Sequence, residues 1–265
     1  MVLSFAKYQG AGNDFIVIDD RIAFFPAHDG AIIRRLCHRQ KGIGADGVIL
    51  LQESDKADFR MRIFNADGGE PSMCGNGIRC LVHYIRGLGF KSSSFKIETM
   101  HSVLACQAFD EKVGVFMGAP HIMHWGIEVL NMTAYVLDTG VPHAVIFVSD
   151  LDNLDVFNLG RAIRTHKLFA PNGVNVDFAA FPSHEGVVRV RTYERGVEAE
   201  TLACGTGAAA VAYVAHVLFG LESLVPILTA SGETLEIHRE EKELLMIGPA
   251  TPVFHGRIEI NGDCV

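Results

Sequence analysis

The sequence predicts a mixed α/β protein, of the α+β kind, built from two similar lobes. Short apolar runs bounded by Gly, Asp, Asn or Pro dominate the chain, as is typical of strands. A few stretches between them have the period of helices. The string Cys-Gly-polar-Gly occurs at Cys74 and again at Cys204, at an offset of 130 residues in a chain of 265. Two copies of one unit predict two lobes that face each other across a pseudo-twofold axis.

The expected elements are spread along the whole chain. Strands are predicted at Leu3–Gln9, Phe15–Ile18, Gly47–Leu51, Arg60–Phe64, Val113–Met117, Ala144–Val148, Val174–Phe181, Val187–Tyr193, Thr234–His238 and Val253–Ile260. Helices are predicted at Ala31–Arg39, Gly75–Arg86, Asn158–Leu168 and Gly205–Phe219.

The duplication extends upstream of the two cysteines. Arg60–Asn65 aligns with Arg189–Glu194 at an offset of 129, so the second copy has one more residue between this strand and its cysteine. Each copy is a strand, a loop, the cysteine string and a helix. We therefore expect an N-terminal lobe of residues 1–119, to which residues 252–265 return, and a C-terminal lobe of residues 120–251.

The composition is that of an ordinary globular protein. Hydrophobic residues make up 49% of the chain and charged residues 20%, which excludes disorder. The net charge is −8 and no block of Lys or Arg is present, so neither nucleic acid nor an anionic membrane is expected as a partner. A small neutral or zwitterionic molecule fits better. The longest apolar stretch, Ala208–Leu221, is too short to span a bilayer, and the strand-like opening is not a secretory signal. We expect a cytoplasmic protein.

The six cysteines are expected to be reduced in that compartment. None forms a Cys-x-x-Cys pair, and His121 with His124 alone supplies no ligand set, so no metal is expected. Four cysteines are expected to be small buried hydrophobic residues, namely Cys37, Cys80, Cys106 and Cys264. Cys74 and Cys204 differ, because their string recurs at equivalent places in two copies, which packing alone would not demand.

The two cysteine strings predict a pair of working thiols. The glycines let the backbone turn tightly and approach a ligand, and they place the cysteine at or just before a helix N-cap. Free N–H groups and the helix dipole there favour a thiolate and can also hold a ligand carboxylate. Where two such helix starts converge, one thiolate removes the α-proton of an amino acid while the opposite thiol protonates the other face. The configuration inverts, and no cofactor is required.

At these residues the chain resembles diaminopimelate epimerases, the pyridoxal-independent enzymes that interconvert LL- and meso-diaminopimelate. The resemblance covers nearly the whole sequence and rests on motifs in the family's order, at Gly10–Phe15, Asn65–Gly68, Met73–Cys80, Gly140–His143, Val174–Val176, Glu194–Gly196 and Ala203–Gly207. It implies two α/β lobes, each with a curved, mostly antiparallel sheet around a central helix, and an active site in the cleft between them.

The resemblance also implies roles for single residues. The catalytic residues would be Cys74 and Cys204, with His143 and Glu194 beside them to set their protonation. The residues implied for the distal, non-reacting end of the substrate are Asn13, Asn65, Asn175 and Arg195. Those implied for the α-carboxylate are Gly75, Asn76, Gly205 and Thr206. Taken without the family, the Asn residues are compatible with turn chemistry, Glu194 and Arg195 with a solvated ion pair, and His143 with an edge histidine.

Two departures from the family pattern bear on the choice of substrate. Val141 stands where the family usually has Asn before Pro-His, and it offers no side-chain hydrogen bond to the distal end of the substrate. The loop 197–201 carries the extra residue of the second copy and lacks the family's usual second Gly. We therefore expect a wider substrate range, which includes shorter amino acids such as glutamate.

Three other interpretations remain open from the sequence. A proline-racemase-like enzyme also uses paired cysteines, but its Asp-Arg and Ser-Pro signatures before Cys-Gly-Thr-Gly are not present here. A thiol-redox protein would need Cys74 and Cys204 in bonding contact. An amino-acid-binding module would not need either thiol. A homodimer is compatible with the sequence, which does not determine the oligomeric state.

Overall fold

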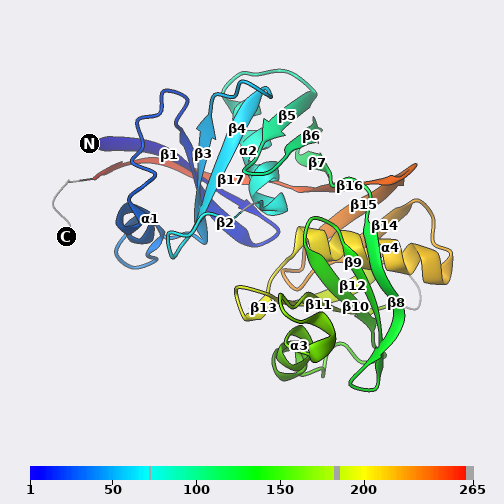
Figure 1. Ribbon diagram of the computed structural model, residues 1–265. Coiled ribbons are helices and arrows are strands. Elements are labelled where there is room, and N and C mark those ends of the chain that lie inside the picture. The colour runs from blue at the N-terminus through cyan, green and yellow to red at the C-terminus, as the bar shows by residue number, and fades with distance from the viewer. Residues whose placement is uncertain (72, 182–185, 261–265) are drawn as a thin grey trace. The chain divides into compact units, whose positions relative to one another are not determined.

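The computed structural model describes residues 1–71, 73–181 and 186–260. It confirms the mixed α+β class. The chain divides into two compact units (Figure 1), the first of Met1–Val115 with Pro249–Val265 and the second of Phe116–Gly248.

The strands of the first unit pair in the order β17–β1–β2–β3–β4–β5–β6–β7. The pairs β2–β3 and β4–β5 are parallel and the others are antiparallel. The strands are β1 (Val2–Gly10), β2 (Asn13–Asp19), β3 (Gly47–Gln52), β4 (Phe59–Asn65), β5 (Ser94–Glu98), β6 (Val103–Ala108), β7 (Lys112–Phe116) and β17 (Thr251–Glu259). The last strand of the chain is therefore the neighbour of the first.

Two helices cover opposite faces of this sheet. Helix α2 (Gly75–Gly87) packs against β1, β2, β3, β4, β6 and β17, so the sheet curves around it (Figure 1). Helix α1 (Gly30–Cys37) packs against β3. Because side chains alternate along a strand, Val48 and Leu50 of β3 join the core under α1, while Ile49 faces the start of α2.

The second unit repeats this topology in the order β8–β9–β10–β11–β12–β14–β15–β16. Here β10–β11 and β12–β14 are parallel, at the same two places in the order, and the short β13 also pairs with β12. The strands are β8 (His121–Val129), β9 (Met132–Asp138), β10 (Pro142–Phe147), β11 (Asn175–Ala180), β12 (Val188–Glu194), β13 (Ala199–Thr201), β14 (Leu224–Leu228), β15 (Thr234–Glu240) and β16 (Glu243–Pro249).

The helices repeat as well. Helix α4 (Gly205–Phe219) is the counterpart of α2 and packs against β9, β10, β11, β12, β14 and β15 (Figure 1). Helix α3 (Val156–Arg164) is the counterpart of α1 and packs against β11, β12 and β13. The sequence duplication is thus a duplication of topology, in which β8 takes the place that β17 takes in the first unit.

One expected helix is shorter than predicted. The sequence predicts a single helix at Asn158–Leu168, whereas α3 ends at Arg164 and a separate 3-10 turn follows at Lys167–Phe169. Asp155 starts α3 because its side chain accepts a hydrogen bond from Asn158 N. Thr165 ends it, with its hydroxyl donating to the Arg161 carbonyl at 2.8 Å.

Several strands were not expected from the sequence, namely β5, β6, β8, β9, β13, β14 and β16. In β8 almost all residues are exposed, so this strand lacks the alternation that marks a strand in a sequence. No helix among the described residues is long and apolar enough to cross a membrane. Cys264, expected to be buried, lies outside the described residues.

Candidate active site

Cys74 is the N-cap of α2, as the Cys-Gly-x-Gly string predicts. Its backbone is extended, and its Sγ accepts a hydrogen bond from Gly77 N at 3.4 Å. The thiol also lies 3.7 Å from Asn13 Oδ1, to which it can donate. Gly75 follows as the first, buried residue of the helix. A ligand anion placed here would meet the free N–H groups and the positive end of the helix dipole.

The floor beneath this helix start is apolar. A Cβ added at Gly77 would lie 3.0 Å from the Ile63 Cδ1 and 3.1 Å from the Ile49 Cδ1 atom. Both side chains are buried in the sheet. Glycine at position 77 therefore lets the first turn of α2 rest directly on the isoleucines of β3 and β4.

Asn76 and Arg79 form a buried polar pair on the same turn. Arg79 is fully buried, and its Nη2 donates to Asn76 Oδ1 at 2.9 Å while its Nε donates to the Pro249 carbonyl at 3.3 Å. The Asn76 amide nitrogen is 3.5 Å from Asn13 Oδ1. The permanent cation of Arg79 is thus linked through Asn76 to the residues around Cys74.

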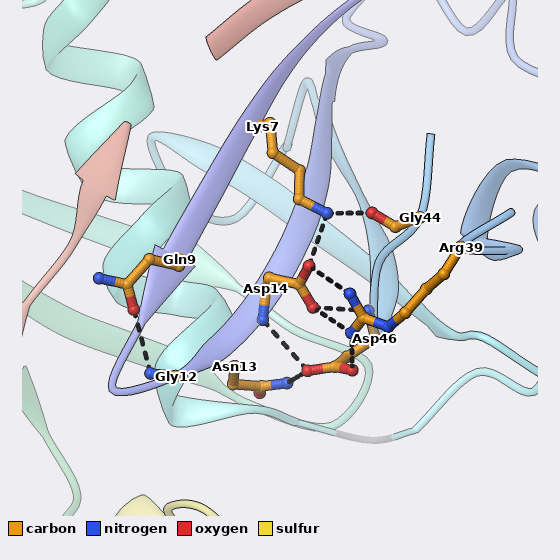
Figure 2. Close-up of polar contacts among 8 residues, drawn as sticks. All are labelled: Lys7, Gln9, Gly12, Asn13, Asp14, Arg39, Gly44 and Asp46. Atoms are coloured by element: carbon orange, nitrogen blue, oxygen red, sulfur yellow. Dashed lines mark hydrogen bonds and ion pairs between the residues drawn. The ribbon is translucent and has the colours of Figure 1, made fainter. Parts of the chain in front are cut away.

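Figure 2 shows how the start of β2, which carries Asn13, is held. Asn13 Nδ2 donates to Asp46 Oδ2 at 2.7 Å, so the amide turns its oxygen toward Cys74. The Arg39 guanidinium bridges Asp46 and the neighbouring Asp14, and Lys7 binds Asp14 at 2.6 Å. Burial alone would raise the pKa of Asp14, but hydrogen bonds and charges from Arg39 and Lys7 lower it to about 2.

Asn65 ends β4 and its side chain is exposed. Its backbone N–H donates to the Gly69 carbonyl at 2.8 Å, and its carbonyl accepts from Gly68 N at 2.9 Å, which closes the turn after the strand. Arg62 and Glu70 clamp the two sides of this turn with two hydrogen bonds of 2.8 Å each.

Cys204 is the N-cap of α4 and so occupies the place that Cys74 has in the first unit. Its Sγ lies 3.3 Å from the Thr206 hydroxyl. Gly205 and Thr206 are buried in the first turn of the helix. The Thr206 carbonyl accepts a hydrogen bond from the Thr139 hydroxyl at 2.8 Å, which fixes the turn to the end of β9.

His143 lies beneath this helix start in a buried polar chain, in which His143 and Asp177 are fully buried. Its Nε2 is 2.8 Å from the Thr206 hydroxyl, and its Nδ1 is 2.6 Å from Asp177 Oδ2. Asp177 Oδ1 in turn accepts from the Thr192 hydroxyl at 2.8 Å. Burial by itself would lower the pKa of His143, but the charge and hydrogen bond of Asp177, aided by Cys204, raise it to about 10.

The remaining predicted residues of the second unit lie around this chain. Asn175 pairs in register with His143 and its Nδ2 lies 3.3 Å from His143 Nε2, while its Oδ1 accepts from Arg195 N at 2.8 Å. The Arg195 side chain donates to the Gly173 carbonyl at 3.1 Å. Burial raises the pKa of Glu194, which ends β12, and the Thr201 hydroxyl and the charge of His143 oppose that rise.

The extra residue of the second copy lies in the turn after β12. In the first unit Arg62 binds Glu70, eight positions on, whereas Arg191 binds Glu200, nine positions on, at 2.7 Å. The longer turn has Glu198 in the left-handed region at φ 58°, and Glu198 binds Arg164 of α3 at 2.9 Å.

Within each unit, therefore, the structure brings most of the predicted residues together. Cys74, Gly75, Asn76 and Asn13 meet in the first unit, and Cys204, Thr206, His143 and Asn175 meet in the second. The sequence reasoning missed four residues of these clusters, namely Arg79, Thr139, Asp177 and Thr192. Asp177 had a visible signal, because it is a charged residue inside the apolar run of β11.

The described residues contain no group of three or more His, Cys, Asp or Glu side chains that could hold a metal ion. The groups that the two helix starts offer for chemistry are thiols, one imidazole, carboxylates and backbone N–H groups.

Solved structures define the class of fold. The chain is similar to a phenazine biosynthesis protein of the PhzF family from Bacillus anthracis, with a TM-score of 0.77 and 16% identity over 98% of this chain and 100% of that one. It is also similar to a hydroxyproline epimerase from Agrobacterium vitis, with a TM-score of 0.72 and 14% identity over 97% of this chain and 92% of that one. The fold is that of the PhzF and proline-racemase-like epimerases.

Sequence comparison narrows the class to a family. The family model for diaminopimelate epimerase matches both halves, at residues 5–123 and 135–253. Diaminopimelate epimerases from Hydrogenobaculum sp. and Aquifex aeolicus are 42% and 41% identical, over 95% and 97% of this chain and 97% and 98% of their own. The chain belongs to the diaminopimelate epimerase family, and it is an isomerase.

Proposed function

We propose that this chain interconverts LL- and meso-diaminopimelate by two-base proton transfer at the α-carbon, with Cys74 and Cys204 as the two bases. The observation that carries the proposal is the repeated device: in two units of the same topology, a cysteine caps the central helix at its N-terminus. Family membership supplies the substrate.

The reaction needs one cysteine as thiolate and the other as thiol. The thiolate takes the α-proton and becomes a thiol. The electron pair left on the α-carbon delocalises into the carboxylate, which becomes an enediolate. The second thiol then gives its proton to the opposite face of the carbon and becomes the thiolate. No atom is lost or gained, and no pyridoxal or metal is consumed by these steps.

The helix N-termini stabilise the charge that develops. An α-carboxylate bound at the first turns of α2 and α4 would be held by Gly75, Asn76, Gly205 and Thr206, whose N–H groups lie at the positive ends of the helix dipoles. The enediolate carries more charge on the same oxygens than the bound substrate does, so these donors lower the barrier as well as bind.

The other predicted residues serve protonation and selectivity in this proposal. His143 and Glu194 set the ionisation of the cysteines. Asn13, Asn65, Asn175 and Arg195 bind the distal end of the substrate. The proposed pathway is that of lysine and peptidoglycan-precursor biosynthesis in the cytoplasm.

Isotope exchange tests the reaction directly. The purified protein is incubated with LL-diaminopimelate in deuterated water without pyridoxal phosphate, and the α-position is followed by NMR and mass spectrometry. Deuterium enters the α-position as meso-diaminopimelate forms, and Cys74→Ser and Cys204→Ser each abolish turnover. A Cys106→Ser variant, which changes a buried cysteine of β6, is the matched control and stays active. Absence of deuterium uptake by the wild-type protein overturns the proposal.

Substrate range is tested separately. The Val141 side chain offers no hydrogen bond where the family usually has Asn, so we propose that shorter amino acids such as L-glutamate are also racemised. Val141→Asn should raise the ratio of kcat/KM for diaminopimelate to kcat/KM for L-glutamate roughly fivefold, because one hydrogen bond contributes about 1 kcal/mol. A wild-type enzyme that turns over diaminopimelate alone contradicts the wider range but leaves the reaction itself intact.

A further inference from the structure

The two cysteines, which the duplication makes equivalent, have different partners. Cys74 Sγ accepts from the Gly77 N–H at 3.4 Å and faces the carbonyl oxygen of the Asn13 side chain. Cys204 makes no cap hydrogen bond to a described residue and faces the Thr206 hydroxyl. A carbonyl oxygen can only accept a hydrogen bond, so Asn13 favours the S–H form of Cys74, while the neutral Gly77 N–H donates to the same sulfur and opposes this preference. A hydroxyl can donate, so it can stabilise the S⁻ form of Cys204.

The Asn13 amide cannot reverse this preference by turning over. Its nitrogen is held by the Asp46 carboxylate at 2.7 Å, which accepts but cannot donate when ionised (Figure 2). Arg39 binds the same carboxylate at 2.8 Å. Asp46 therefore keeps the oxygen of Asn13 directed at the thiol of Cys74.

The Thr206 hydroxyl is oriented by His143 and Asp177. Where His143 is protonated, Nε2–H donates to Thr206 Oγ1 at 2.8 Å, and the single proton of the hydroxyl is then free to donate to Cys204 Sγ at 3.3 Å. Transfer of the Cys204 proton along this chain gives a thiolate and an imidazolium. Asp177, fully buried at 2.6 Å from Nδ1, stabilises the imidazolium.

Asn175 disfavours a proton on His143 Nε2, so its effect has to be compared with that of Asp177. Its Oδ1 is committed to Arg195 N, so its Nδ2 points at His143 Nε2 from 3.3 Å and disfavours a proton there. Asp177 acts with a full charge at the shorter distance of 2.6 Å, in a site without solvent exposure, whereas the amide acts with a dipole only. The carboxylate dominates, because charge–charge interactions are strong where water is excluded.

The titratable groups that face His143 come from three elements. β11 contributes Asp177, β12 contributes Glu194, and the start of α4 contributes Cys204, while β9 places Leu137 opposite it in register. Asp177 is the one in direct ionic contact with the imidazole.

We propose that Asp177 is a positioning residue that keeps His143 protonated and directed at Thr206, and that Cys204 is in consequence the resting thiolate and Cys74 the resting thiol. The catalytic meaning of this assignment rests on the proposed two-base mechanism. The ionisation of the two cysteines can be measured without it.

The test is alkylation of the substrate-free protein by iodoacetamide from pH 5.5 to 10, with the modified fraction of each cysteine counted by peptide mass spectrometry. The readout is the pH at which the rate of each cysteine reaches half of its maximum, because accessibility changes the maximum but not that pH. We expect the midpoint of Cys204 to lie below that of Cys74 by ~1 pH unit or more, since only the thiolate reacts.

Asp177→Asn should raise the Cys204 midpoint by ~1 pH unit or more and leave the Cys74 midpoint in place. Asp177→Glu, which keeps the charge, should restore part of the shift. Asp152→Asn removes a carboxylate from the exposed ion pair with Arg189 in the same unit and should change neither midpoint. Thr206→Val breaks the chain without touching the ion pair, and it should raise the Cys204 midpoint even if Asp177→Asn does not fold.

Equal midpoints, a lower midpoint for Cys74, or a Cys204 midpoint unchanged in both Asp177→Asn and Thr206→Val would overturn the inference. These outcomes are separate from the isotope test. A protein that exchanges deuterium with equal midpoints keeps the proposed function and loses the assignment, whereas separated midpoints without exchange do the opposite.

Discussion

The starts of α2 and α4 have the same backbone arrangement, but the side chains on which they rest differ. Strand register and the contacts of Gly77 and Gly207 show which residues beneath the two helices correspond. They are Phe15, Ile49 and Ile63 in the first unit and His143, Asp177 and Thr192 in the second. The first set is apolar and the second is a hydrogen-bonded ionic chain.

The buried cation also differs between the two starts. In the first unit it is Arg79, which is permanently charged and acts through Asn76, and in the second it is His143, which can titrate and acts through Thr206. In the proposed assignment, the charge that acts on Cys74 is therefore fixed, whereas the charge that acts on Cys204 depends on the protonation of His143. The two units have the same backbone geometry around their cysteines and differ in the polar groups that surround them.

The largest expected effect comes from removing the ionic floor of the second unit. Asp177→Asn should lower kcat for diaminopimelate by ~10²-fold with little change in KM, because His143 would no longer support the Cys204 thiolate. It should also lower the free energy of unfolding by roughly 3 kcal/mol, since it leaves the imidazole buried without its counter-charge. Steady-state kinetics and urea denaturation measure the two. A loss confined to KM would contradict a role in protonation, and Asp177→Glu is the matched control.

The two helix glycines should respond unequally to alanine. A Cβ at Gly207 would overlap Asp177 Oδ1 and lie 3.3 Å from the His143 ring, both held in the buried ion pair. A Cβ at Gly77 would meet two isoleucine methyl groups, which can move. We expect Gly207→Ala to cost about 3 kcal/mol of unfolding free energy and Gly77→Ala about 1 kcal/mol. Equal losses of unfolding free energy in urea denaturation would show that the side chains beneath the two glycines move aside equally easily.

The contributions of His143 and Asp14 to the free energy of unfolding should depend on pH in opposite directions. The raised pKa of His143, from 6.5 to about 10, makes its contribution complete below pH 6.5 and lost as the pH rises toward 10. The lowered pKa of Asp14, from 3.8 to about 2, makes its contribution complete above pH 3.8 and lost as the pH falls toward 2.

Unfolding free energies from pH 3 to 9.5 test this contrast. The difference between the wild-type protein and Asp177→Asn should narrow above pH 6.5, whereas the difference between the wild-type protein and Asp14→Asn should narrow below pH 3.8. If the first difference is constant across this range, His143 is not held as a cation.

Much of this comparison could be predicted from the sequence, because the features that specify it are local. A cysteine before Gly-x-Gly specifies an N-cap, and the recurrence of the string specifies two similar units. The family motifs pointed to His143, Glu194 and the asparagines. Helix α4 was predicted at its observed bounds, since Gly205 opens it and Gly220 ends it in the left-handed conformation at φ 65°.

The remainder depends on contacts between strands that are distant in sequence. Asp177 and His143 meet only because β10 and β11 are parallel and in a particular register, which no local pattern specifies. Arg79 looked like an ordinary helix arginine, yet it is buried because α2 is enclosed by the sheet and by the strand that returns from the C-terminal end. β8 was missed because its side chains are exposed on both faces.

The smallest expected effect is at the acceptor that faces Cys74. Asp46→Ala frees the Asn13 amide, which can then rotate and present its nitrogen to the sulfur. A donor in place of an acceptor stabilises the thiolate, so the alkylation midpoint of Cys74 should fall by a few tenths of a pH unit. The size is limited because the 3.7 Å contact is long and one neutral hydrogen bond contributes only about 1 kcal/mol.

Asp19→Ala, which removes a carboxylate paired with Arg21 in the same unit, is the control and should leave the midpoint unchanged. A rise in the Cys74 midpoint would mean that Asn13 does not act as its acceptor, and the asymmetry of the two thiols would then depend on Asp177 alone.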